Sequence, residues 1–368
     1  MRICLIAVEI FAWGKYGGFG RATRIIGREL VKRGIDVTAV VPRRADQRPV
    51  EDLEGIRVLS YIPKYWLHSS ALYKEANADI YHSMEPSLGT FLAQRAMPHR
   101  KHLVTFRDPR NFDDWLIELS YPSLNRLQVI SNWLYEDNFL VKQAVRRANA
   151  CFTTAHCLIN KTKMKYRLQQ APGFLPTPVA IPAKIEKSSE PTVCYLARLD
   201  RRKRPELFLD LARSFPEVNF LVAGQSRNPD WEQYLRQKYA VYPNLQFLGF
   251  IDQFSGDGLN DLLGKSWIMV NTSAREGLPN SFLEAAAHGC AILSSVNPDD
   301  FASRYGFHVL GDNFEEGLRF LLQNNRWKER GLLARQEMAA VFSLDKAIES
   351  HISAYERILS LPETTQPA

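Results

Sequence analysis

Apolar and polar residues alternate along the chain in a pattern that predicts strands and helices in turn. An apolar run at residues 3–8 predicts a first strand. Apolar residues at helical spacing follow between Ile25 and Val31, and a second apolar run at residues 37–41 predicts the next strand. Because strands and helices alternate, we expect a parallel sheet with helices on both faces.

The second half of the chain repeats this alternation. Strands are predicted at residues 192–196, 219–223, 245–250, 267–271 and 291–295, and helices at residues 205–214 and 280–288. Between the halves, residues 171–182 contain four prolines, which exclude a helix or a central strand. We therefore predict an N-terminal Rossmann-like domain at 1–175, a linker at 176–190, a second domain at 191–334 and C-terminal helices at 335–368.

Composition narrows the class of protein. The 368 residues are 45% hydrophobic and 24% charged, a globular balance that excludes a disordered chain, a collagen and a small disulfide scaffold. The five cysteines form no Cys-x-x-Cys pair, so we expect a reducing compartment and no zinc site. Glu9 interrupts the opening apolar run, which favours a strand over a signal peptide, and no run reaches the ~18 residues of a membrane span. We expect a cytoplasmic protein, at most at the cytoplasmic face of the membrane.

The formal charge of +7 is unevenly divided along the chain. Residues 1–180 contain 26 Lys and Arg against 16 Asp and Glu, a charge of +10, and the remainder carries −3. A basic surface suits an anionic partner. No RNA- or DNA-binding motif occurs, so we expect an anionic acceptor or an anionic membrane surface at the N-terminal domain, and no nucleic acid.

The first candidate site is the glycine-rich segment 17–20, which follows the first strand and opens the first helix. Glycines let backbone N–H groups approach a phosphate at a helix N-terminus. The segment departs from the dinucleotide fingerprint, because Thr23 stands where Gly or Ala belongs, and it is not a P-loop. A tight turn that needs glycine explains it equally well.

The second candidate is the basic stretch from Arg198 to Arg204, between a strand and a helix. The guanidinium of Arg198 and the ammonium of Lys203 could hold a diphosphate there. The alternative is a basic turn in solvent, and we expect Arg201 and Arg202 to be solvated in this way.

The third candidate combines Glu276, in a loop after a strand, with Glu284 on an Ala-rich helix. Eight residues are slightly over two helical turns, so both carboxylates can face one ligand and accept hydrogen bonds from its hydroxyl groups. The amides of Gly277 to Asn280 point to the same place and favour an anion. A surface Glu at a helix start explains Glu276, whereas Glu284 in an apolar helix needs a partner.

These three motifs, in this order and spacing, resemble the retaining nucleotide-sugar glycosyltransferases of the GT-B fold, glycosyltransferase family 4. The shared features are the Gly-Gly loop, the clamp from Arg198 to Lys203, and two Glu separated by seven residues before a Gly. The resemblance implies two Rossmann-like domains with parallel sheets facing across a central cleft. It also implies that the helices from about residue 335 cross back to the N-terminal domain.

The activity implied by the resemblance is that of a hexosyltransferase-like, retaining enzyme. It would move a sugar from a UDP- or GDP-sugar to a glycan, lipid-linked or small-molecule acceptor, in cell-surface polysaccharide or glycolipid synthesis. Of the matching residues, Arg198 and Lys203 would stabilise the departing nucleoside diphosphate, and Glu276 would contact the donor sugar as the third catalytic residue. The donor-binding residues are expected to be Gly18, Gly224, Gly277, Leu278, Pro279, Asn280 and Glu284. No Asp-x-Asp sequence occurs, so we expect no metal and no cofactor besides the donor.

The N-terminal half departs from the family pattern. His82 and Glu85 are the acceptor-side candidates, although a lone His is more often structural, and Arg107 stands where relatives have His, which suggests an anionic acceptor. Residues 112–145 are rich in apolar side chains that would cap the acceptor cleft, touch a membrane or form core. The alternatives to the transferase are a GT-B epimerase or phosphorylase, and a catalytically inactive scaffold or nucleotide-sugar-binding protein.

Overall fold

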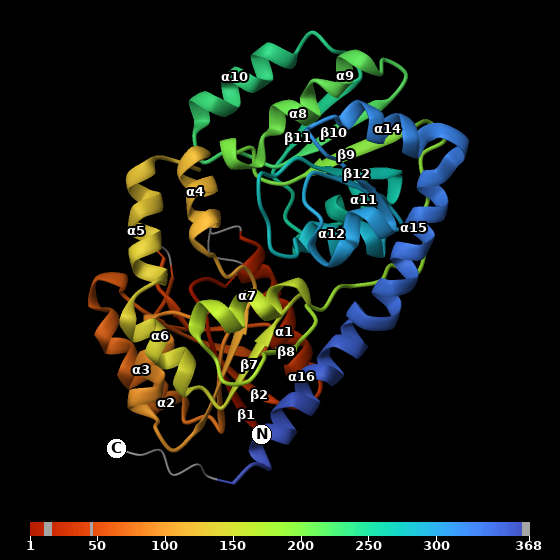
Figure 1. Cartoon of the computed structure of the whole chain (residues 1–368). Coiled ribbons are helices and arrows are strands. Elements are labelled where there is room, and N and C mark those ends of the chain that lie inside the picture. Colours follow the sequence, from red (N-terminus) through yellow and green to blue (C-terminus); the bar gives the residue numbers. More distant parts are fainter. Residues whose placement is uncertain (11–16, 45–46, 363–368) are drawn as a thin grey trace. The chain divides into compact units, whose positions relative to one another are not determined.

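The computed structural model describes residues 1–10, 17–44 and 47–362. Contacts divide the chain into two compact units, each with its own sheet (Figure 1). Unit 1 comprises Met1–Pro109, Asn132–Pro178 and Leu344–Ala368, and unit 2 comprises Arg110–Ser131 and Val179–Ser343.

Unit 1 is built on an eight-stranded sheet in the order β3-β4-β2-β1-β5-β6-β7-β8. All neighbouring strands are parallel except β3 and β4, an antiparallel pair at one edge. The strands are β1 (Arg2–Ile6), β2 (Asp36–Pro42), β3 (Val50–Leu53), β4 (Ile56–Tyr61), β5 (Ile80–Ser83), β6 (Lys101–Phe106), β7 (Ala150–Thr153) and β8 (Gly173–Phe174). The helices are α1 (Gly18–Lys32), η1 (Pro63–His68), α2 (Ser69–Ala76), α3 (Leu88–Ala96), α6 (Phe139–Arg147), α7 (Cys157–Tyr166) and α16 (Leu344–Leu359), and α5 (Arg126–Glu136) has residues in both units.

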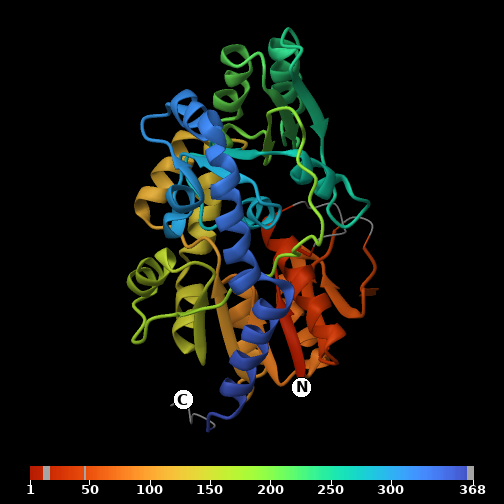
Figure 2. The ribbon, with the colours of Figure 1, turned by 90° about the vertical axis from the view of Figure 1, so that its right-hand side faces the viewer.

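The C-terminal helix α16 belongs to the core of unit 1, although the rest of that unit comes from the first half of the chain. It lies beside α1 (Figure 2). Its apolar face buries Ile348, Tyr355 and Ile358 in the same cluster as Ile3 and Leu5 of β1. Burial of each such side chain contributes roughly 1.5–3 kcal/mol, so the helix is held by packing rather than by its own propensity.

Unit 2 is built on a six-stranded, wholly parallel sheet in the order β11-β10-β9-β12-β13-β14. The strands are β9 (Thr192–Leu196), β10 (Asn219–Ala223), β11 (Leu245–Gly249), β12 (Ile268–Asn271), β13 (Ala291–Ser294) and β14 (Gly306–His308). The helices are α4 (Phe112–Ser120), η2 (Arg201–Lys203), α8 (Pro205–Leu209), α9 (Leu211–Ser214), α10 (Pro229–Tyr239), α11 (Gly258–Lys265), α12 (Asn280–Ala287), η3 (Pro298–Asp300), α13 (Phe301–Tyr305), α14 (Phe314–Leu322), η4 (Gln323–Asn325), α15 (Arg326–Glu337) and the π-helical η5 (Met338–Phe342).

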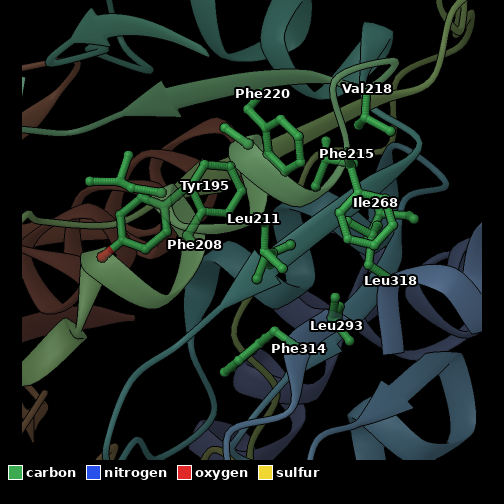
Figure 3. Packing of buried hydrophobic residues seen from close by; sticks show 14 of the residues in the cluster. Tyr195, Phe208, Leu211, Phe215, Val218, Phe220, Ile268, Leu293, Phe314 and Leu318 are labelled. Carbon is green, nitrogen blue, oxygen red and sulfur yellow. The ribbon is translucent and has the colours of Figure 1, made fainter. Parts of the chain in front are cut away.

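The core of unit 2 lies between its sheet and the helices α8, α9 and α14 (Figure 3). Phe208, Phe215 and Phe220 are each no more than 2% exposed, and Ile268 and Leu293 come from the neighbouring central strands. Such a rigid apolar base holds the loops at the ends of β9 and β12, from which the charged residues described below project.

The predicted alternation of strands and helices is confirmed. The strands at 192–196 and 219–223 occur with their predicted bounds, because most of their apolar residues are buried in a parallel sheet. The helix predicted at 205–214 is divided into α8 and α9 at Asp210. No helix among the described residues is long and apolar enough to cross a membrane.

The units do not follow the predicted domain boundaries. Residues 110–131 pack with unit 2 instead of the N-terminal domain, because Trp115 is 1% exposed there and Glu118 meets arginines of unit 2. Residues 335–343 also stay in unit 2, where Arg335 donates to the carbonyls of Ala287 and Pro182, and the chain returns to unit 1 at Leu344.

Candidate functional site

Three predicted site residues of unit 2 follow neighbouring strands at the same edge of the sheet. Arg198 comes after β9, Gly224 after β10 and Glu276 after β12, and these strands are adjacent in the order β10-β9-β12. The connections run to one side from β9 to β10 and to the other side from β12 to β13. Such a switch point at the carboxyl ends of parallel strands is where open α/β sheets bind ligands.

Lys203 and Glu276, which are 73 residues apart in the sequence, form an ion pair between these loops. Lys203 ends the short helix η2, and each of the two side chains is 12% exposed. The Ser273 hydroxyl donates to the Glu276 carboxylate at 2.9 Å and fixes its direction. Burial lowers the pKa of Lys203, and Glu276 opposes this shift, so the ammonium depends on an anion close by.

Arg198 lies beside Asp200 at the start of the same loop. The NH1 of Arg198 and the Oδ2 of Asp200 are 3.4 Å apart, and neither buried atom makes a hydrogen bond with the described residues. Burial lowers the pKa of Arg198, and Asp200 opposes this shift. A buried guanidinium nitrogen without a hydrogen-bond partner can donate to an anionic ligand without first losing another hydrogen bond.

Gly224 is required by the close approach of two backbones. It has φ +145°, and a Cβ at this position would overlap the carbonyl oxygen of Ala197, which precedes Arg198. Ala197 N–H in turn donates to the Ala223 carbonyl at 3.2 Å. Gly224 therefore shapes the backbone from which Arg198 projects.

The segment Gly277 to Asn280 leads into α12. Gly277 is buried, and Leu278, Pro279 and Asn280 are partly exposed. Pro279 is the N-cap of α12 and gives no side-chain cap, so backbone N–H groups of the first turn can face an anion. Glu284 lies on α12 and is 8% exposed, as expected for a carboxylate in an apolar helix.

Arg202 does not lie in solvent, so this prediction is wrong. It is 8% exposed, and its NH1 lies 3.2 Å from the Glu118 carboxylate of α4. Arg201 is exposed, as predicted, and its guanidinium stacks on the Trp231 ring at 4.1 Å. The sequence does not indicate which of the two arginines is buried. Adjacent residues of a basic run differ in burial only because the tertiary structure places different partners beside them.

Arg204 and Arg275 are further charged residues near the candidate site. Arg204 has φ +45°, a left-handed conformation that favours glycine, and its guanidinium donates to the Thr272 carbonyl at 2.7 Å and to Asp312. Arg275, 5% exposed, precedes Glu276 and donates to Glu118 at 3.0 Å. The sequence feature that indicates the pair of Arg275 and Glu118 is Glu118 itself, because a charged residue within an apolar segment needs a partner.

In unit 1, the side chain of Glu9 occupies the position that a phosphate would take in the predicted loop. Gly18 is the exposed first residue of α1, and the Glu9 carboxylate accepts from the Gly20 N–H at 3.1 Å. A Cβ at Gly17 would overlap this carboxylate. Glycine is thus needed here for an internal N-terminal cap, which favours the tight-turn interpretation over a free phosphate site.

His82, on β5, is fully buried. Its Nδ1 hydrogen-bonds the Tyr355 hydroxyl of α16 at 2.8 Å, and its Nε2 hydrogen-bonds the Thr105 hydroxyl of β6 at 2.7 Å. Burial lowers the pKa of His82 well below its usual value, so the ring is neutral. These contacts describe a structural residue that joins the C-terminal helix to the sheet.

Glu85 and Arg107 lie close together after β5 and β6. The Arg107 backbone N–H donates to the Glu85 carboxylate at 3.0 Å, and the Arg107 guanidinium donates to Thr177 at 2.9 Å. Burial raises the pKa of Glu85 to about 8 and lowers that of Arg107 to about 10. The Nε of Arg107 is buried and makes no hydrogen bond with the part of the chain that the structure describes.

Comparison with known proteins agrees with this architecture. Residues 180–300 match the family model of Glycosyl transferases group 1. The O-antigen biosynthesis glycosyltransferase WbnH of Escherichia coli is 25% identical over 172 residues, 45% of this chain and 46% of that protein. The probable O-antigen biosynthesis glycosyltransferase WbiN of E. coli matches to the same extent. The chain thus covers about half of the length of these curated relatives.

Solved structures resemble the whole chain at low identity. Sucrose-phosphate synthase from Thermosynechococcus elongatus has a TM-score of 0.74 and 16% identity over 98% of this chain and 99% of that chain. Anabaena HepE in complex with UDP and glucose has a TM-score of 0.69 and 13% identity over 97% and 100%. Residues 180–300 are thus similar to the Glycosyl transferases group 1 domain, and the chain has two parallel-sheet α/β units that match the GT-B fold of these solved structures.

Proposed function

We propose that the chain is a glycosyltransferase that moves a sugar from a nucleoside-diphosphate sugar to an acceptor hydroxyl. The observation that carries this proposal is the group of charges at the ends of β9 and β12. There, the Arg198 NH1 lies 3.4 Å from Asp200 but makes no hydrogen bond with the described residues, and buried Lys203 is paired with Glu276. A diphosphate has the negative oxygens that both cations can bind. The match to Glycosyl transferases group 1 supports this proposal.

In the proposed reaction, the bond between the anomeric carbon and the diphosphate oxygen breaks, and negative charge develops on that oxygen. Arg198 and Lys203 stabilise this charge. Lys203 exchanges Glu276 for the diphosphate, which leaves the Glu276 carboxylate to accept from a hydroxyl of the sugar. The acceptor oxygen bonds to the anomeric carbon on the face that the diphosphate leaves, and its proton passes to the departing diphosphate. This is the retaining course of glycosyltransferase family 4.

The proposed donor is a UDP- or GDP-sugar, and the reaction is proposed to need no metal, because the two cations take the place of a divalent ion. Incubation with a panel of nucleotide sugars, with release of nucleoside diphosphate as the readout, tests the activity. Release that persists after dialysis against EDTA supports metal independence, and recovery only with Mg²⁺ or Mn²⁺ contradicts it. The anomeric configuration of the product by NMR tests retention.

If no sugar nucleotide is turned over with any acceptor, the enzyme proposal fails. Binding of UDP or GDP without turnover would then favour a nucleotide-sugar-binding protein. Because two E. coli relatives carry O-antigen biosynthesis in their names, oligosaccharide acceptors of cell-surface polysaccharide are the first acceptors to test, followed by lipid-linked ones.

We also propose that unit 1 contacts an anionic membrane surface through α6, α7 and the preceding residues. Residues 132–167 contain seven Lys and Arg against two Asp and Glu. Leu134, Phe139 and Met164 are each at least 71% exposed in the same segment. Sedimentation with phosphatidylserine-containing vesicles, against phosphatidylcholine alone, tests this. Loss of binding is expected for Phe139→Ser with Met164→Ser, and equal binding to both vesicle types would contradict the proposal.

A further inference from the structure

Glu118, on α4, is the meeting point of three arginines. Its Oε1 accepts from Arg275 at 3.0 Å and from Arg110 at 3.3 Å, and it lies 3.2 Å from the NH1 of Arg202. The Glu118 side chain is 10% exposed, and those of Arg202 and Arg275 are 9% and 5% exposed. Asp114, one turn earlier, accepts from Arg275 at 3.2 Å.

Two of these arginines directly precede the residues of the candidate site. Arg202 is followed by Lys203 and Arg275 by Glu276, and Lys203 and Glu276 pair with each other. Glu118 thus contacts the residue before each member of that pair. In Figure 1, α4 lies near the loop that precedes α8, although eighty residues of sequence lie between Ser120 and Arg201.

Two hydrogen bonds to backbone carbonyls also join the two loops. The Ala274 N–H donates to the Arg202 carbonyl at 3.0 Å, and the Thr272 hydroxyl donates to the Lys203 carbonyl at 2.6 Å. These bonds leave the side chains of Arg202 and Arg275 as two buried cations next to each other's loop. Without a carboxylate between them, two such charges would repel and would have to move toward solvent, and their loops with them.

Helix α4, which carries Glu118, has a buried tryptophan and a side-chain cap at its start. Trp115 is 1% exposed, and the Arg110 guanidinium lies 4.9 Å from its ring centre. Asn111 caps α4 by accepting from the Asp114 N–H at 2.9 Å. Glu118 is therefore presented from a capped and packed helix, which gives it a defined position relative to both loops.

We propose that Glu118 is a positioning residue that holds the loops of Lys203 and Glu276 in the arrangement that binds the donor diphosphate. This inference rests on the proposed function for the identity of the ligand, but not for the contacts. Glu118 touches neither Lys203 nor Glu276 in the contacts described; it acts through Arg202 and Arg275.

The test compares Glu118→Gln with Glu29→Gln. Glu29, on α1 of unit 1, is the matched control, because it is 4% exposed and contacts three cations, Arg28, Lys32 and Arg33, away from these loops. The readouts are hydrogen–deuterium exchange of peptides covering 198–204 and 272–280, and the dissociation constants of UDP and GDP. Glu118→Gln is expected to raise exchange in both peptides at least tenfold and to weaken nucleotide binding at least tenfold. Glu29→Gln is expected to change neither more than twofold.

Unchanged exchange and binding in Glu118→Gln, or an equal change in Glu29→Gln, would overturn the positioning role. Glu118→Asp keeps the charge and is expected to recover part of the binding, which a purely structural loss would not. If Glu118→Gln does not fold, Arg202→Gln removes the contact between this carboxylate and the loop of Lys203, and it is expected to raise exchange in the 198–204 peptide. If the wild-type chain binds neither UDP nor GDP, the proposed function fails, while the exchange measurement still decides the role of Glu118.

Discussion

Two groups of polar residues, one in each unit, lie at the carboxyl ends of parallel strands and yet differ in kind. In unit 1, His82 is buried with both ring nitrogens bonded to Tyr355 and Thr105. In unit 2, Lys203 and Glu276 are paired in loops and keep 12% of each side chain exposed. The first group joins elements of the fold, and the second is an ion pair that the proposed donor diphosphate would exchange.

The difference shows that residue type and strand position alone do not identify a site. A neutral imidazole with two hydrogen-bond partners has no capacity left for a substrate. The Arg198 NH1, by contrast, is buried without a hydrogen-bond partner among the described residues and therefore has capacity to spare. Hydrogen-bond satisfaction thus distinguishes His82 from Arg198.

The largest expected effect is in unit 2. Lys203→Ala and Glu276→Ala are each expected to reduce turnover by about 10²- to 10³-fold or more, since each removes a charge from the reacting centre. Both variants are expected to keep the native fold, with a lower thermal midpoint because each leaves one member of a buried ion pair without its partner. Turnover against the donor identified in the panel, with circular dichroism for the fold, measures this, and near-wild-type rates in either variant would refute the assignment.

The second prediction concerns stability in unit 1. His82→Leu leaves the hydroxyls of Tyr355 and Thr105 without their partner in the core, at an expected cost of about 2–4 kcal/mol. Urea unfolding measures the loss, and UDP binding at a temperature where the variant is folded should be unchanged. The exposed His68, changed to Leu, is the control and should shift stability by less than about 0.5 kcal/mol. Weakened UDP binding in His82→Leu would place His82 in the site after all.

The third prediction is the pH dependence of unfolding. Burial lowers the pKa of His82 well below 6.5 and that of His351 to about 3, so the unfolded chain binds their protons first and stability falls as pH drops below about 6.5. Each imidazole contributes a slope of about 1.4 kcal/mol per pH unit. Glu85 acts in the opposite sense: with a folded pKa of about 8 against 4.5 unfolded, its contribution is lost as pH rises from about 4.5 to 8.

Burial also lowers the pKa of His102 to about 4 and that of His288, which adds to the loss on the acid side, so stability is expected to be greatest between about pH 6.5 and 7. Urea unfolding between pH 4.5 and 8.5 locates the maximum. In Glu85→Gln the decline above the maximum should vanish, and the slope on the acid side should steepen. A maximum that Glu85→Gln leaves in place would contradict a buried carboxyl with a raised pKa.

The smallest effect is expected at Arg201, the exposed neighbour of buried Arg202. Arg201→Ala removes a stacking contact with Trp231 at an exposed site, which contributes roughly 0.5–1 kcal/mol. UDP binding should stay within twofold of wild type. A tenfold loss would show that the basic run acts as a whole, and the distinction between its two arginines would be lost.

The sequence predicted the α/β class, the strands of unit 2 except β14, and the order of the charged loops. These features depend on local information: apolar runs make buried strands, and prolines and glycines end them. Because loops between parallel strands and helices return to one edge of a sheet, Arg198, Gly224 and Glu276 could be expected to follow strands there before any coordinates were known.

Tertiary structure alone decided the partners. Contacts between distant segments decided four features that the sequence did not predict. Arg202 faces Glu118, Glu9 accepts from Gly20 at the start of α1, and His82 bonds Tyr355. Residues 110–131 belong to unit 2. The pattern of residues says which side chains must be buried, but not what lies opposite. For a charged or titratable group, the partner and the loss of solvent set its pKa and its freedom to bind, and both arise only when the chain has folded.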